Sequence, residues 1–542
     1  MGIPVRTERP APARVVACSP LSTDAVAHVF TNQKSVAYMR SYVFAGGLVY
    51  SHPLYLHQAI GITKMIAAAR VVGYHALLDD CGLGKTIQAL YAVTALQRAQ
   101  IINKIVIVCK SDLAQNWIEE ISKHTPNWKV QVLCGVAGVK NRSWNPRADA
   151  YIINYELLGR SERNARYTLR DPWNLRKFDV TQDVANLTRV LTKQRCALII
   201  DESHKIGNTT ARVTRVLCGL AKLARVRYIL TGTLESESVL NAFSQVYFLD
   251  GGRLFGKSWR AFMRMYAETR LVWVHSGHPI SKVCGFKNLD DYRAKLRTVS
   301  TRRTKEQCLD LPEKIVKTRW LTAGKDQYRL LCRIRDTVTE IVSSGHGEYV
   351  TILPGSNLSA AIVRLMVAAA MPTVLGEHAA SAKLDALAET MQETNEQIIV
   401  WCVHRSVCEH VRNKLGTDCV MIYGGMQDAQ ARIDRFKSGA VRTLVATQDS
   451  LREGHNLQNA AHAVYFQLSW SLRSWMQSQN RIHRIGQQQS VVIERFALIS
   501  SLDKYILSLV DAKEHAVRSA QTASGDRSVV LRRDEFLQAL AW

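Results

Sequence analysis

The chain has 542 residues, of which 47% are hydrophobic and 22% charged, ordinary proportions for a soluble globular protein. It contains no run of 18 apolar residues, and its N-terminus lacks the apolar core of a signal peptide, so we expect neither a membrane span nor secretion. Its 71 basic residues exceed its 46 acidic ones, and this net charge of +25 indicates a polyanionic partner such as nucleic acid. A merely well-solvated basic surface is the simpler alternative, and a membrane surface is a weaker one.

The twelve cysteines are scattered along the chain and form no C-x-x-C pair. Cys402 and Cys408 lie close together in sequence, but no histidine cluster accompanies them. We therefore expect reduced, mostly buried thiols and no zinc site. This composition favours an intracellular, cytoplasmic protein, or one in the host cytoplasm if the chain is viral.

The first informative elements in chain order are a strand, a turn and a helix. Residues 76–78 form a short apolar run, and residues 87–96 carry apolar side chains at helical spacing. Between them the segment DDCGLGKT, residues 79–86, ends like the phosphate-binding pattern G-x-x-x-x-G-K-[ST]. Asp79 stands where that pattern begins with glycine, so the context of strand and helix has to support the interpretation.

This turn has the chemistry of a nucleotide site. Gly82 and Gly84 let the backbone N–H groups face phosphate oxygens, and the N-terminus of the following helix favours anions. We expect Lys85 to contact the β- and γ-phosphates of ATP and Thr86 to bind Mg²⁺ through its hydroxyl. The alternative is a capped turn with a solvent-facing lysine.

An acidic pair follows a second buried strand. Residues 197–200 are apolar, and Asp201 and Glu202 come directly after them in the segment CALIIDESH. Ligands of open α/β sheets bind at the carboxyl ends of the strands. We therefore expect Asp201 to hold Mg²⁺ through water and Glu202 to polarise the attacking water. The alternative is that the two acids only cap the next helix.

Further strands predict a second α/β unit. Residues 228–230 are apolar and precede the small turn of Thr231, Gly232 and Thr233. Residues 397–404 and 442–450 are two more apolar runs, separated by helix-like segments. This second unit has no glycine-lysine loop of its own.

Near the end of this second unit lies the segment WMQSQNRIHRIGQ. Gln477, Arg481 and Arg484 are spaced i, i+4 and i+7, so we expect them on one face of a helix. Arginines that one domain directs toward a nucleotide held by another stabilise charge on the γ-phosphate. A solvated basic helix is the alternative.

Taken in order, these segments resemble the Swi/Snf-type translocases of the superfamily-two helicase-like ATPases, over roughly residues 52–515. The loop DDCGLGKTIQAL is similar to that family's DExGLGKT loop, which itself begins with aspartate. The other similar stretches are LYLHQ, IVIVCKSDLAQNWIEEI, YIINYELL, DESHKIGN, STRRTKEQCLDLPEK, SAKLDALAETM, IYGGM, EGHNLQNA and NRIHRIGQQQSVVIERF. The resemblance implies an α/β fold with two tandem RecA-like lobes, each a parallel sheet flanked by helices, with helical insertions.

The resemblance also implies roles for individual residues. Gln58 is in the position of an adenine-reading glutamine. The expected ATP-binding set is completed by Asp79, Asp80, Cys81, Gly82, Leu83, Gly84, Lys85, Thr86, Gly454 and Gln477. The expected catalytic residues are Lys85, Asp201, Glu202, Arg481 and Arg484. The turn Thr231, Gly232 and Thr233 is expected to couple ATP to DNA, and Lys110, Asn154, Thr447 and Trp470 are expected to contact DNA.

The sequence departs from the family pattern at three places. Leu234 replaces the proline that usually follows the hydroxyl turn. Gln467 replaces an acidic residue, and His455 interrupts the usual glycine-leucine-asparagine of residues 454–456. These departures bear on rate and coupling rather than on the class of protein.

The motifs divide the chain into five parts: an N-terminal extension at 1–51, a first lobe at 52–318, a helical bridge at 319–374, a second lobe at 375–518 and a tail at 519–542. Two basic insertions extend the first lobe. Residues 156–195 carry nine basic and five acidic residues, and residues 256–305 carry twelve and three. Aromatic residues accompany the second insertion, so we expect it to track a DNA backbone through residues such as Arg260 and Arg264. A solvated hairpin with an aromatic core is the alternative.

These expectations converge on an ATP-driven, double-stranded DNA translocase or remodeller that uses ATP and Mg²⁺ and acts on duplex or branched DNA. A strand-separating DNA helicase is the nearest alternative, because the same ATPase engine serves both activities. A non-catalytic DNA-binding scaffold with a degenerate ATP site is the alternative from another class, and a P-loop kinase or GTPase fits less well because neither needs the second lobe.

Overall fold

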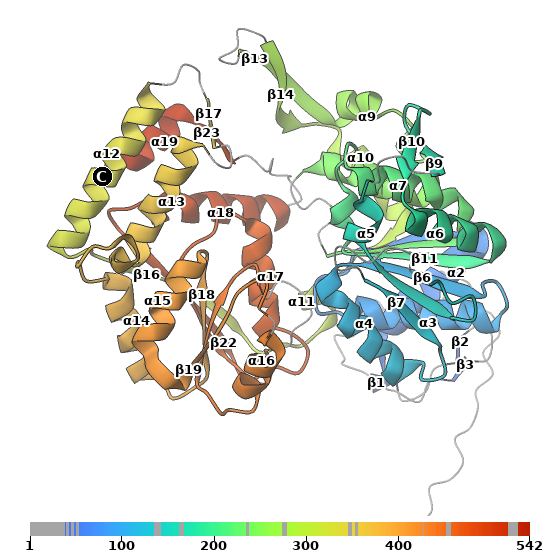
Figure 1. The fold of residues 1–542 in the computed structure, drawn as a ribbon, viewed down its shortest axis with the longest axis horizontal. Helices are drawn as coiled ribbons and strands as arrows, with labels where there is room; N and C mark the ends of the chain where they lie inside the picture. Colours follow the sequence, from blue (N-terminus) through green and yellow to red (C-terminus); the bar gives the residue numbers. More distant parts are fainter. Residues whose placement is uncertain are drawn as a thin grey trace, which may run out of the picture.

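The computed structural model describes residues 38–39, 43–44, 48–49, 54–134, 143–161, 167–232, 234, 238–273, 279–344, 349–352, 356–426, 428–450, 457–518 and 529–542. Two of the expected site residues, Thr233 and Gly454, lie outside these ranges. The described chain forms two α/β lobes, which lie side by side in Figure 1 with the short helix α11 (Lys305–Cys308) between them.

The first lobe is built on a seven-stranded, all-parallel sheet with the order β15-β5-β12-β11-β6-β8-β7. Its strands are β5 (Tyr74–Leu77), β6 (Lys104–Cys109), β7 (Val130–Leu133), β8 (Ala150–Asn154), β11 (Cys196–Asp201), β12 (Val226–Leu230) and β15 (Ser300–Thr301). The central strands are continuous apolar runs, because helices cover both faces of a parallel sheet.

Alternate residues of these strands enter two separate cores. Ile105 and Ile107 of β6 pack in the core formed with helices α2 (Leu56–Val71), α3 (Lys85–Arg98) and α4 (Ser111–His124). Val106 and Val108 face the opposite core. That second core also contains residues of α5 (Tyr155–Gly159), α6 (Gln182–Lys193), α7 (Arg212–Leu220) and α8 (Ala242–Asp250).

The second lobe is built on a six-stranded, all-parallel sheet with the order β16-β22-β21-β18-β20-β19. Its strands are β16 (Lys314–Leu321), β18 (Ile398–Cys402), β19 (Cys419–Ile422), β20 (Thr443–Thr447), β21 (His462–Tyr465) and β22 (Val491–Leu498). Its helices are α12 (Lys325–Ser343), α13 (Asn357–Ala370), α14 (Ala382–Glu393), α15 (Arg405–Leu415), α16 (Ala429–Lys437), α17 (Leu472–Ile482), α18 (Asp503–Arg518) and α19 (Arg533–Leu540). The expected α/β fold with two parallel sheets flanked by helices is confirmed.

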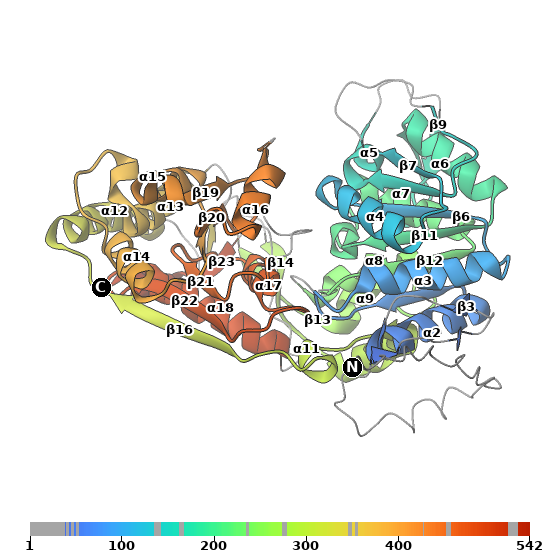
Figure 2. The same ribbon diagram turned by 90° about the horizontal axis from the view of Figure 1, so that it is seen from below.

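The second lobe includes more of the chain than its motifs indicate. β16 pairs with β22 along its whole length and forms the edge of the second sheet, so the boundary expected at 318 falls inside a strand of this lobe (Figure 2). Helices α12 and α13, in the segment expected to bridge the lobes, pack in the core of the second lobe. The C-terminal segment also joins it, since β23 (Val529–Arg532) pairs with β17 (Tyr349–Ile352) and α19 packs in the same core.

The basic insertions contain hairpins as well as the expected helices. The first includes the antiparallel pair β9 (Tyr167–Arg170) and β10 (Lys177–Val180) beside α6. The second contains α9 (Trp259–Tyr266), the antiparallel pair β13 (Ala267–Trp273) and β14 (Pro279–Phe286), and α10 (Leu289–Val299). This second hairpin projects from the body of the first lobe (Figure 1).

Four short strands precede α2: β1 (Tyr38–Met39), β2 (Val43–Phe44), β3 (Leu48–Val49) and β4 (Leu54–Tyr55). Within the described ranges, the structure contains no helix that combines the length and the apolar character needed to cross a membrane.

Candidate nucleotide site

The phosphate loop lies between β5 and α3, as its sequence context predicts. Gly82 and Gly84 have positive φ angles of 93° and 75°, a conformation that glycine adopts without steric cost. Gly84 is the N-cap of α3, and Lys85 is its first residue. The free N–H groups of the first helical turn therefore surround the loop, which is the arrangement that binds phosphate.

Lys85 is held against the loop by its own backbone. Its ammonium donates to the carbonyl oxygens of Asp79 at 2.9 Å and of Asp80 at 3.3 Å. Burial disfavours the charged ammonium, but the nearby acids, Glu202 and Asp201 among them, outweigh burial and raise the pKa of Lys85. Lys85 is therefore a permanent cation at the point where phosphates would bind.

Asp79, the residue that departs from the strict loop pattern, has a structural partner. Its carboxylate is fully buried and accepts from Arg303 Nε at 2.9 Å, Arg303 Nη2 at 2.5 Å and Gln88 Nε2 at 3.1 Å. Arg303 also donates to the carbonyl of His57 and to Gln88 Oε1. The aspartate thus anchors the start of the loop to α3 and to the segment that leaves the first lobe.

Gln58 lies against the same loop. Its Nε2 is 3.4 Å from the carbonyl oxygen of Leu83, and its Oε1 accepts from Tyr55 N at 3.1 Å at the start of α2. A Cβ atom at Gly84 would lie 2.3 Å from Gln58 Nε2, so only glycine leaves room for this contact. The structure places Gln58 at the nucleotide loop, and its reading of adenine remains an expectation.

The acidic pair lies at the carboxyl end of β11, as expected. Asp201 Oδ2 accepts from the indole N–H of Trp117 at 2.8 Å, and its Oδ1 accepts from the backbone N–H of Glu202 at 3.0 Å. The hydroxyl of Tyr155 donates to the Asp201 carbonyl at 2.5 Å. Glu202 has a φ of 52°, a strained backbone conformation for a residue with a long side chain.

Glu202 is ionised in this environment. Burial would raise its pKa, but the contact from His204, whose Nδ1 is 3.1 Å from Glu202 Oε2, and the charges of Lys85 and Lys110 lower it to about 2. A carboxylate of this kind suits the orientation and polarisation of water.

Thr86 and Asp201 have the oxygen chemistry that Mg²⁺ prefers. Mg²⁺ in nucleotide sites is usually held by one or two protein oxygens together with phosphates and water. In the described residues, no group of three or more His, Cys, Asp or Glu side chains is arranged to hold a metal ion, so a protein-only metal cage is not indicated here. Thr86, in the first turn of α3, and Asp201 fit the metal that accompanies a nucleotide.

The turn after β12 packs directly on the phosphate loop. A Cβ atom at Gly232 would lie 2.9 Å from Cys81 Sγ, and the backbone N–H of Thr231 donates to Leu77 O at 3.2 Å. Leu234, in place of the family's proline, is buried, and its carbonyl accepts from Gln245 at 2.9 Å. Ser203, which follows the acidic pair, donates to the same Gln245 at 2.6 Å. Gln245 therefore links the acidic pair to the segment that follows the turn of Thr231 and Gly232.

The two arginines come from the second lobe, but not from one continuous helix. Gln477 and Arg481 lie on α17, which ends at Ile482, so the expectation that Arg484 continues the same helical face is wrong. Arg484 nevertheless reaches the phosphate loop, since its Cβ would lie 3.6 Å from a Cβ atom at Gly82. Burial, and then Arg481, lower the pKa of Arg484 to about 10.

The residues expected to contact DNA have different surroundings. Lys110 is the N-cap residue of α4 and is partly exposed, and Arg260 and Arg264 are exposed on α9. Asn154 is buried, and its side chain donates to Ser111 Oγ at 2.8 Å and accepts from Leu157 N at 3.3 Å. Asn154 therefore positions the exposed Ser111, and its contact with DNA stays a prediction.

Of the two expected DNA contacts in the second lobe, Thr447 is buried and Trp470 is half-buried. Thr447 ends β20 and is buried. The indole N–H of Trp470 is 3.3 Å from Met366 Sδ, and its ring packs edge-on against Tyr505. Gln467, in the usual acidic position, accepts from Val403 N and His404 N at 3.0 Å each, which is the capping contact that a carboxylate would make.

The aromatic residues of the second insertion form a core. Phe262, Tyr266 and Tyr292 are buried and pack around Phe255, with ring centroids 4.9 to 5.7 Å apart. Of the two interpretations of these aromatic residues, a DNA-facing surface or an aromatic core, the core holds for these three. The side chain of Trp273 lies outside the described part.

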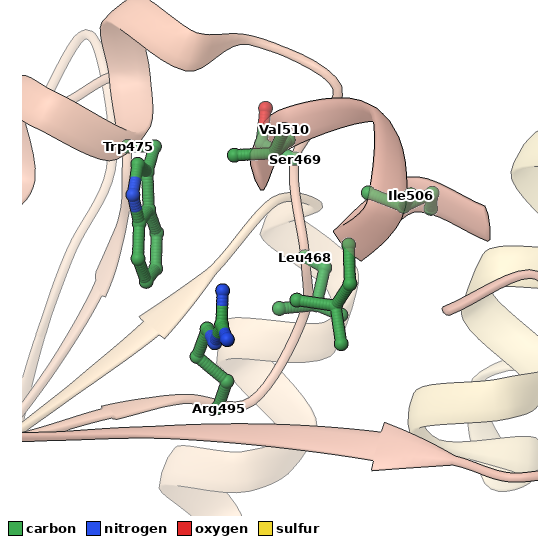
Figure 3. Close-up of a pocket in the computed structure, with 7 residues that line it drawn as sticks. Leu468, Ser469, Trp475, Arg495, Ile506 and Val510 are labelled. Atoms are coloured by element: carbon green, nitrogen blue, oxygen red, sulfur yellow. The ribbon is translucent and has the colours of Figure 1, made fainter. Parts of the chain in front are cut away.

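A small pocket in the second lobe is unrelated to the phosphate loop. It is lined by Leu468, Ser469, Trp475, Arg495, Ile506, Leu507 and Val510, and Figure 3 shows Trp475 and Arg495 turned toward one another across it. The guanidinium of Arg495 lies 5.6 Å from the Trp475 ring centroid and donates to Asp511 at 2.6 Å. Its apolar lining and neutralised cation do not suit a triphosphate.

Several residues of the site were not assigned from the sequence. Trp117 and Tyr155 hold the acidic pair, and Arg303 holds the loop, through hydrogen bonds made across long sequence separations. Each lies in a segment that resembles the family, so the segments were found, but a motif does not reveal which partner its side chains meet.

Comparisons with known proteins agree with this arrangement. Residues 57–362 match the SNF2-related domain, and residues 382–486 match the helicase conserved C-terminal domain. The human "DNA annealing helicase and endonuclease ZRANB3" is 24% identical over 501 residues, which cover 88% of this chain and 42% of that protein. "Uncharacterized ATP-dependent helicase YqhH" of Bacillus subtilis is 21% identical, covering 85% of this chain and 80% of that protein.

Among solved structures, the Sulfolobus solfataricus SWI2/SNF2 ATPase core in complex with dsDNA is 21% identical, with a TM-score of 0.39 and coverage of 87% of this chain and 93% of that one. The chain spans less than half the length of ZRANB3. Because the SNF2-related domain match alone extends over more than half of the sequence, the chain belongs to the SNF2-related family of helicase-like ATPases.

Proposed function

We propose that this protein is an ATP-dependent translocase or remodeller of double-stranded DNA. The observation that carries the proposal is the approach of Arg484, from the second lobe, to the phosphate loop at Gly82, in the first. A site that needs both lobes links each cycle of ATP binding and hydrolysis to relative movement of the lobes.

The chemistry of the site supports hydrolysis. Lys85 and the N-terminus of α3 would bind the phosphates, Thr86 and Asp201 would hold Mg²⁺, and Glu202 would orient water. The metal would supply charge neutralisation of the phosphates. Arg481 and Arg484 would add positive charge as the cleft closes, when negative charge develops on the γ-phosphate.

The coupling to DNA is proposed to run through the edges of the same site. The indole N–H of Trp117 on α4 donates to the Asp201 carboxylate, and the hydroxyl of Tyr155 on α5 donates to the Asp201 backbone carbonyl. Helix α4 begins at the exposed Ser111, whose Oγ accepts from Asn154, the residue before α5. A phosphate backbone held at the start of α4 would act on the metal-binding carboxylate through the Trp117 hydrogen bond, and through α5 it would act on the backbone of the same residue. The exposed Arg260 and Arg264 extend the basic surface.

The relatives' names support an ATP-driven motor on DNA, since one is called a DNA annealing helicase and another an ATP-dependent helicase. The deciding experiment measures ATP hydrolysis without nucleic acid and with single strands, duplex and forked DNA, together with displacement of a third strand from a triplex. We expect stimulation by duplex and triplex displacement without separation of the duplex. Separation of forked strands would instead assign a helicase, and no hydrolysis with any DNA would assign a scaffold.

A further inference from the structure

The segment that joins the two sheets contains a motif to which the proposed cycle gives no role. It is the sequence TRRTKEQ, residues 301–307, which follows β15 and includes α11. Its side chains contact both lobes, and their contacts meet at the phosphate loop.

The first half of this segment is fixed to the first lobe. Leu78 N donates to Thr301 O at 2.7 Å, and Asp80 N donates to Arg303 O at 3.0 Å, so the segment runs beside the phosphate loop as an added strand would. The Arg303 side chain pairs with the buried Asp79. The backbone N–H of Lys305 then donates to Asp80 Oδ2 at 3.2 Å.

The second half of the segment is bonded to the second lobe, at helix α17 and at His483, which directly precede Arg484. Lys305 is buried, and its ammonium donates to Asn480 Oδ1 at 2.5 Å and to the carbonyl oxygen of His483 at 2.6 Å. Further along, His483 Nε2 lies 2.9 Å from the Pro312 carbonyl, and Lys314 donates to Gln479 Oε1 at 3.0 Å.

Lys305 and Arg484 converge on one point of the phosphate loop. A Cβ atom at Gly82 would lie 3.5 Å from Lys305 Cε and 3.6 Å from Arg484 Cβ. The carbonyl that Lys305 holds belongs to His483, the residue directly before Arg484. Helix α17 ends at Ile482, so it does not hold the backbone of Arg484 in place. The hydrogen bond from Lys305 to the His483 carbonyl therefore sets the position at which the Arg484 backbone begins.

We propose that Lys305 is a positioning residue for hydrolysis, which latches the chain at Asn480 and His483 so that Arg484 lies against the phosphate loop. The inference rests on the proposed ATPase function and names a residue that regulates the same site. Lys305 acts through Arg484, so its loss should lower turnover more than nucleotide affinity.

Burial weakens the charge on Lys305, but the contacts of its side chain do not require that charge. Burial lowers its pKa to about 8, and Cys81 and Asp80 oppose this effect while Arg484 and Lys314 add to it. The neutral amine keeps its hydrogen-bond donors, so the latch to Asn480 and His483 does not depend on the proton.

The test compares Lys305→Met, which keeps the length of the side chain and removes its donors, with Lys325→Met, which removes an exposed lysine of α12. We expect Lys305→Met to lower the DNA-stimulated kcat by about 10²-fold, the cost of displacing a catalytic group by about 1 Å. The affinity for a fluorescent ATP analogue should change less than threefold. Lys325→Met should match the wild type in both measurements.

Hydrogen exchange of the nucleotide-free protein tests the latch independently of catalysis. Lys305→Met should raise amide exchange in residues 479–485 and leave β22 unchanged. Asn480→Ala, which removes the acceptor from the opposite side, should reproduce both effects, and the double variant should be no worse than either single one. If Lys305→Met fails to fold, Asn480→Ala alone tests the proposal.

Three outcomes separate the possibilities. Wild-type kcat and exchange in Lys305→Met, or in Asn480→Ala, would overturn the latch. A large loss of nucleotide affinity would overturn it in favour of a direct phosphate contact. Failure of the wild type to bind or hydrolyse ATP would remove the proposed function, and the hydrogen-exchange result would still decide whether the latch exists.

Discussion

At the scale of a single residue, the aspartate at position 79 has a structural role. Its buried carboxylate holds Arg303 through two hydrogen bonds, and Arg303 in turn holds the backbone of His57. A glycine here would leave the guanidinium partly buried without its counter-ion, which typically costs about 3–5 kcal/mol. The variant start of the loop is therefore part of the attachment between the nucleotide loop and the segment that leads to the second lobe.

Lys85→Ala should abolish hydrolysis and leave DNA affinity largely intact, because the ammonium lies at the phosphate loop, where it donates to the carbonyl oxygens of Asp79 and Asp80. Loss of one such electrostatic contact usually lowers the rate by about two to three orders of magnitude. Steady-state turnover and duplex binding by anisotropy measure the two effects. Wild-type turnover of the purified variant would remove the phosphate-binding role of this lysine.

Glu202→Gln should bind ATP and stall before hydrolysis. The amide keeps the size of the side chain but loses the negative charge that the low pKa of Glu202 maintains at neutral pH. Equilibrium nucleotide binding and single-turnover hydrolysis separate the two steps. Failure of this variant to bind nucleotide would show that Glu202 is structural, which its strained backbone would then explain.

Two histidines beside the loop make the stability of the first lobe depend on pH. Burial lowers the pKa of His57 and of His75 to about 4; His57 also faces Arg303 and Asp79, and His75 also faces Lys64, Asp79 and Arg303. The unfolded chain binds protons at these sites below pH 6.5 and the folded chain does not until about pH 4. The free energy of unfolding must therefore fall as the pH falls through this window.

His75→Gln isolates this effect, since glutamine can keep the hydrogen bond to Thr301 Oγ1 that His75 makes at 2.9 Å. From pH 7 to pH 4 the variant should lose less stability than the wild type, by up to about 3 kcal/mol for a shift of this size. Urea denaturation at several pH values, followed by the signal of the first lobe, measures the difference. Parallel pH profiles for the two proteins would show that His75 titrates normally.

At the scale of elements, buried central strands were predicted from the sequence. The apolar runs at 197–200 and 397–404 match β11 and β18 because central strands of parallel sheets are buried on both faces. The β16 strand was not predicted as part of the second lobe. Its pattern, KIVKTRWL, mixes basic and apolar residues because it lies at the sheet edge, and only its pairing with β22 reveals its place.

The helix α9 separates the two interpretations of the second insertion. Phe262 and Tyr266 face the core, and Arg260 and Arg264, also four residues apart, are exposed. The sequence left open whether the aromatic residues lie in a core or on a DNA-facing surface, and the structure places Phe262 and Tyr266 in the core. Basic and aromatic residues occur together both in an amphipathic helix and on a DNA-tracking surface. Composition alone therefore does not distinguish the two, and the buried side of the helix has to be known.

Reversing both charges, Arg260→Glu with Arg264→Glu, should weaken binding to all DNA sequences about equally and reduce its salt dependence, because phosphate contacts release counterions. Arg329→Glu with Arg333→Glu is a matched control, since these arginines have the same spacing on the exposed face of α12. Binding titrations of unrelated duplexes over a range of salt measure both quantities. A loss confined to one sequence, or equal losses in the two variants, would contradict backbone tracking by α9.

At the scale of the whole molecule, the order of motifs predicted both lobes, but not how they are joined. The chain passes from β15 to β16 within a dozen residues. Along this passage the backbone N–H of Lys305 bonds the phosphate loop, and the side chains of Lys305 and Lys314 bond α17. These contacts form between residues up to 225 positions apart. Local periodicity carries no information about them, so the sequence predicts the parts of the site and not the distance between them.

Arg484→Ala tests whether hydrolysis needs both lobes. Lys85, Asp201 and Glu202 all belong to the first lobe, where Lys85 and Asp201 would hold nucleotide and metal, whereas Arg484 enters from the second lobe. An arginine that acts mainly on the transition state lowers kcat without altering ground-state binding. Nucleotide affinity should therefore change little, and DNA-stimulated turnover should fall by about 10³-fold or more.

DNA that bridges the lobes would favour closure, so the Arg484→Ala variant should lose stimulation by duplex more than it loses basal turnover. The matched control is Arg412→Ala, which removes an exposed arginine of α15 in the same lobe. Fluorescent nucleotide titration and turnover with and without duplex measure affinity, basal rate and stimulation separately. A tenfold weaker affinity with a normal saturated rate would make Arg484 a ground-state anchor for ATP. Hydrolysis would then proceed without the contribution from the second lobe that the proposed translocation cycle requires.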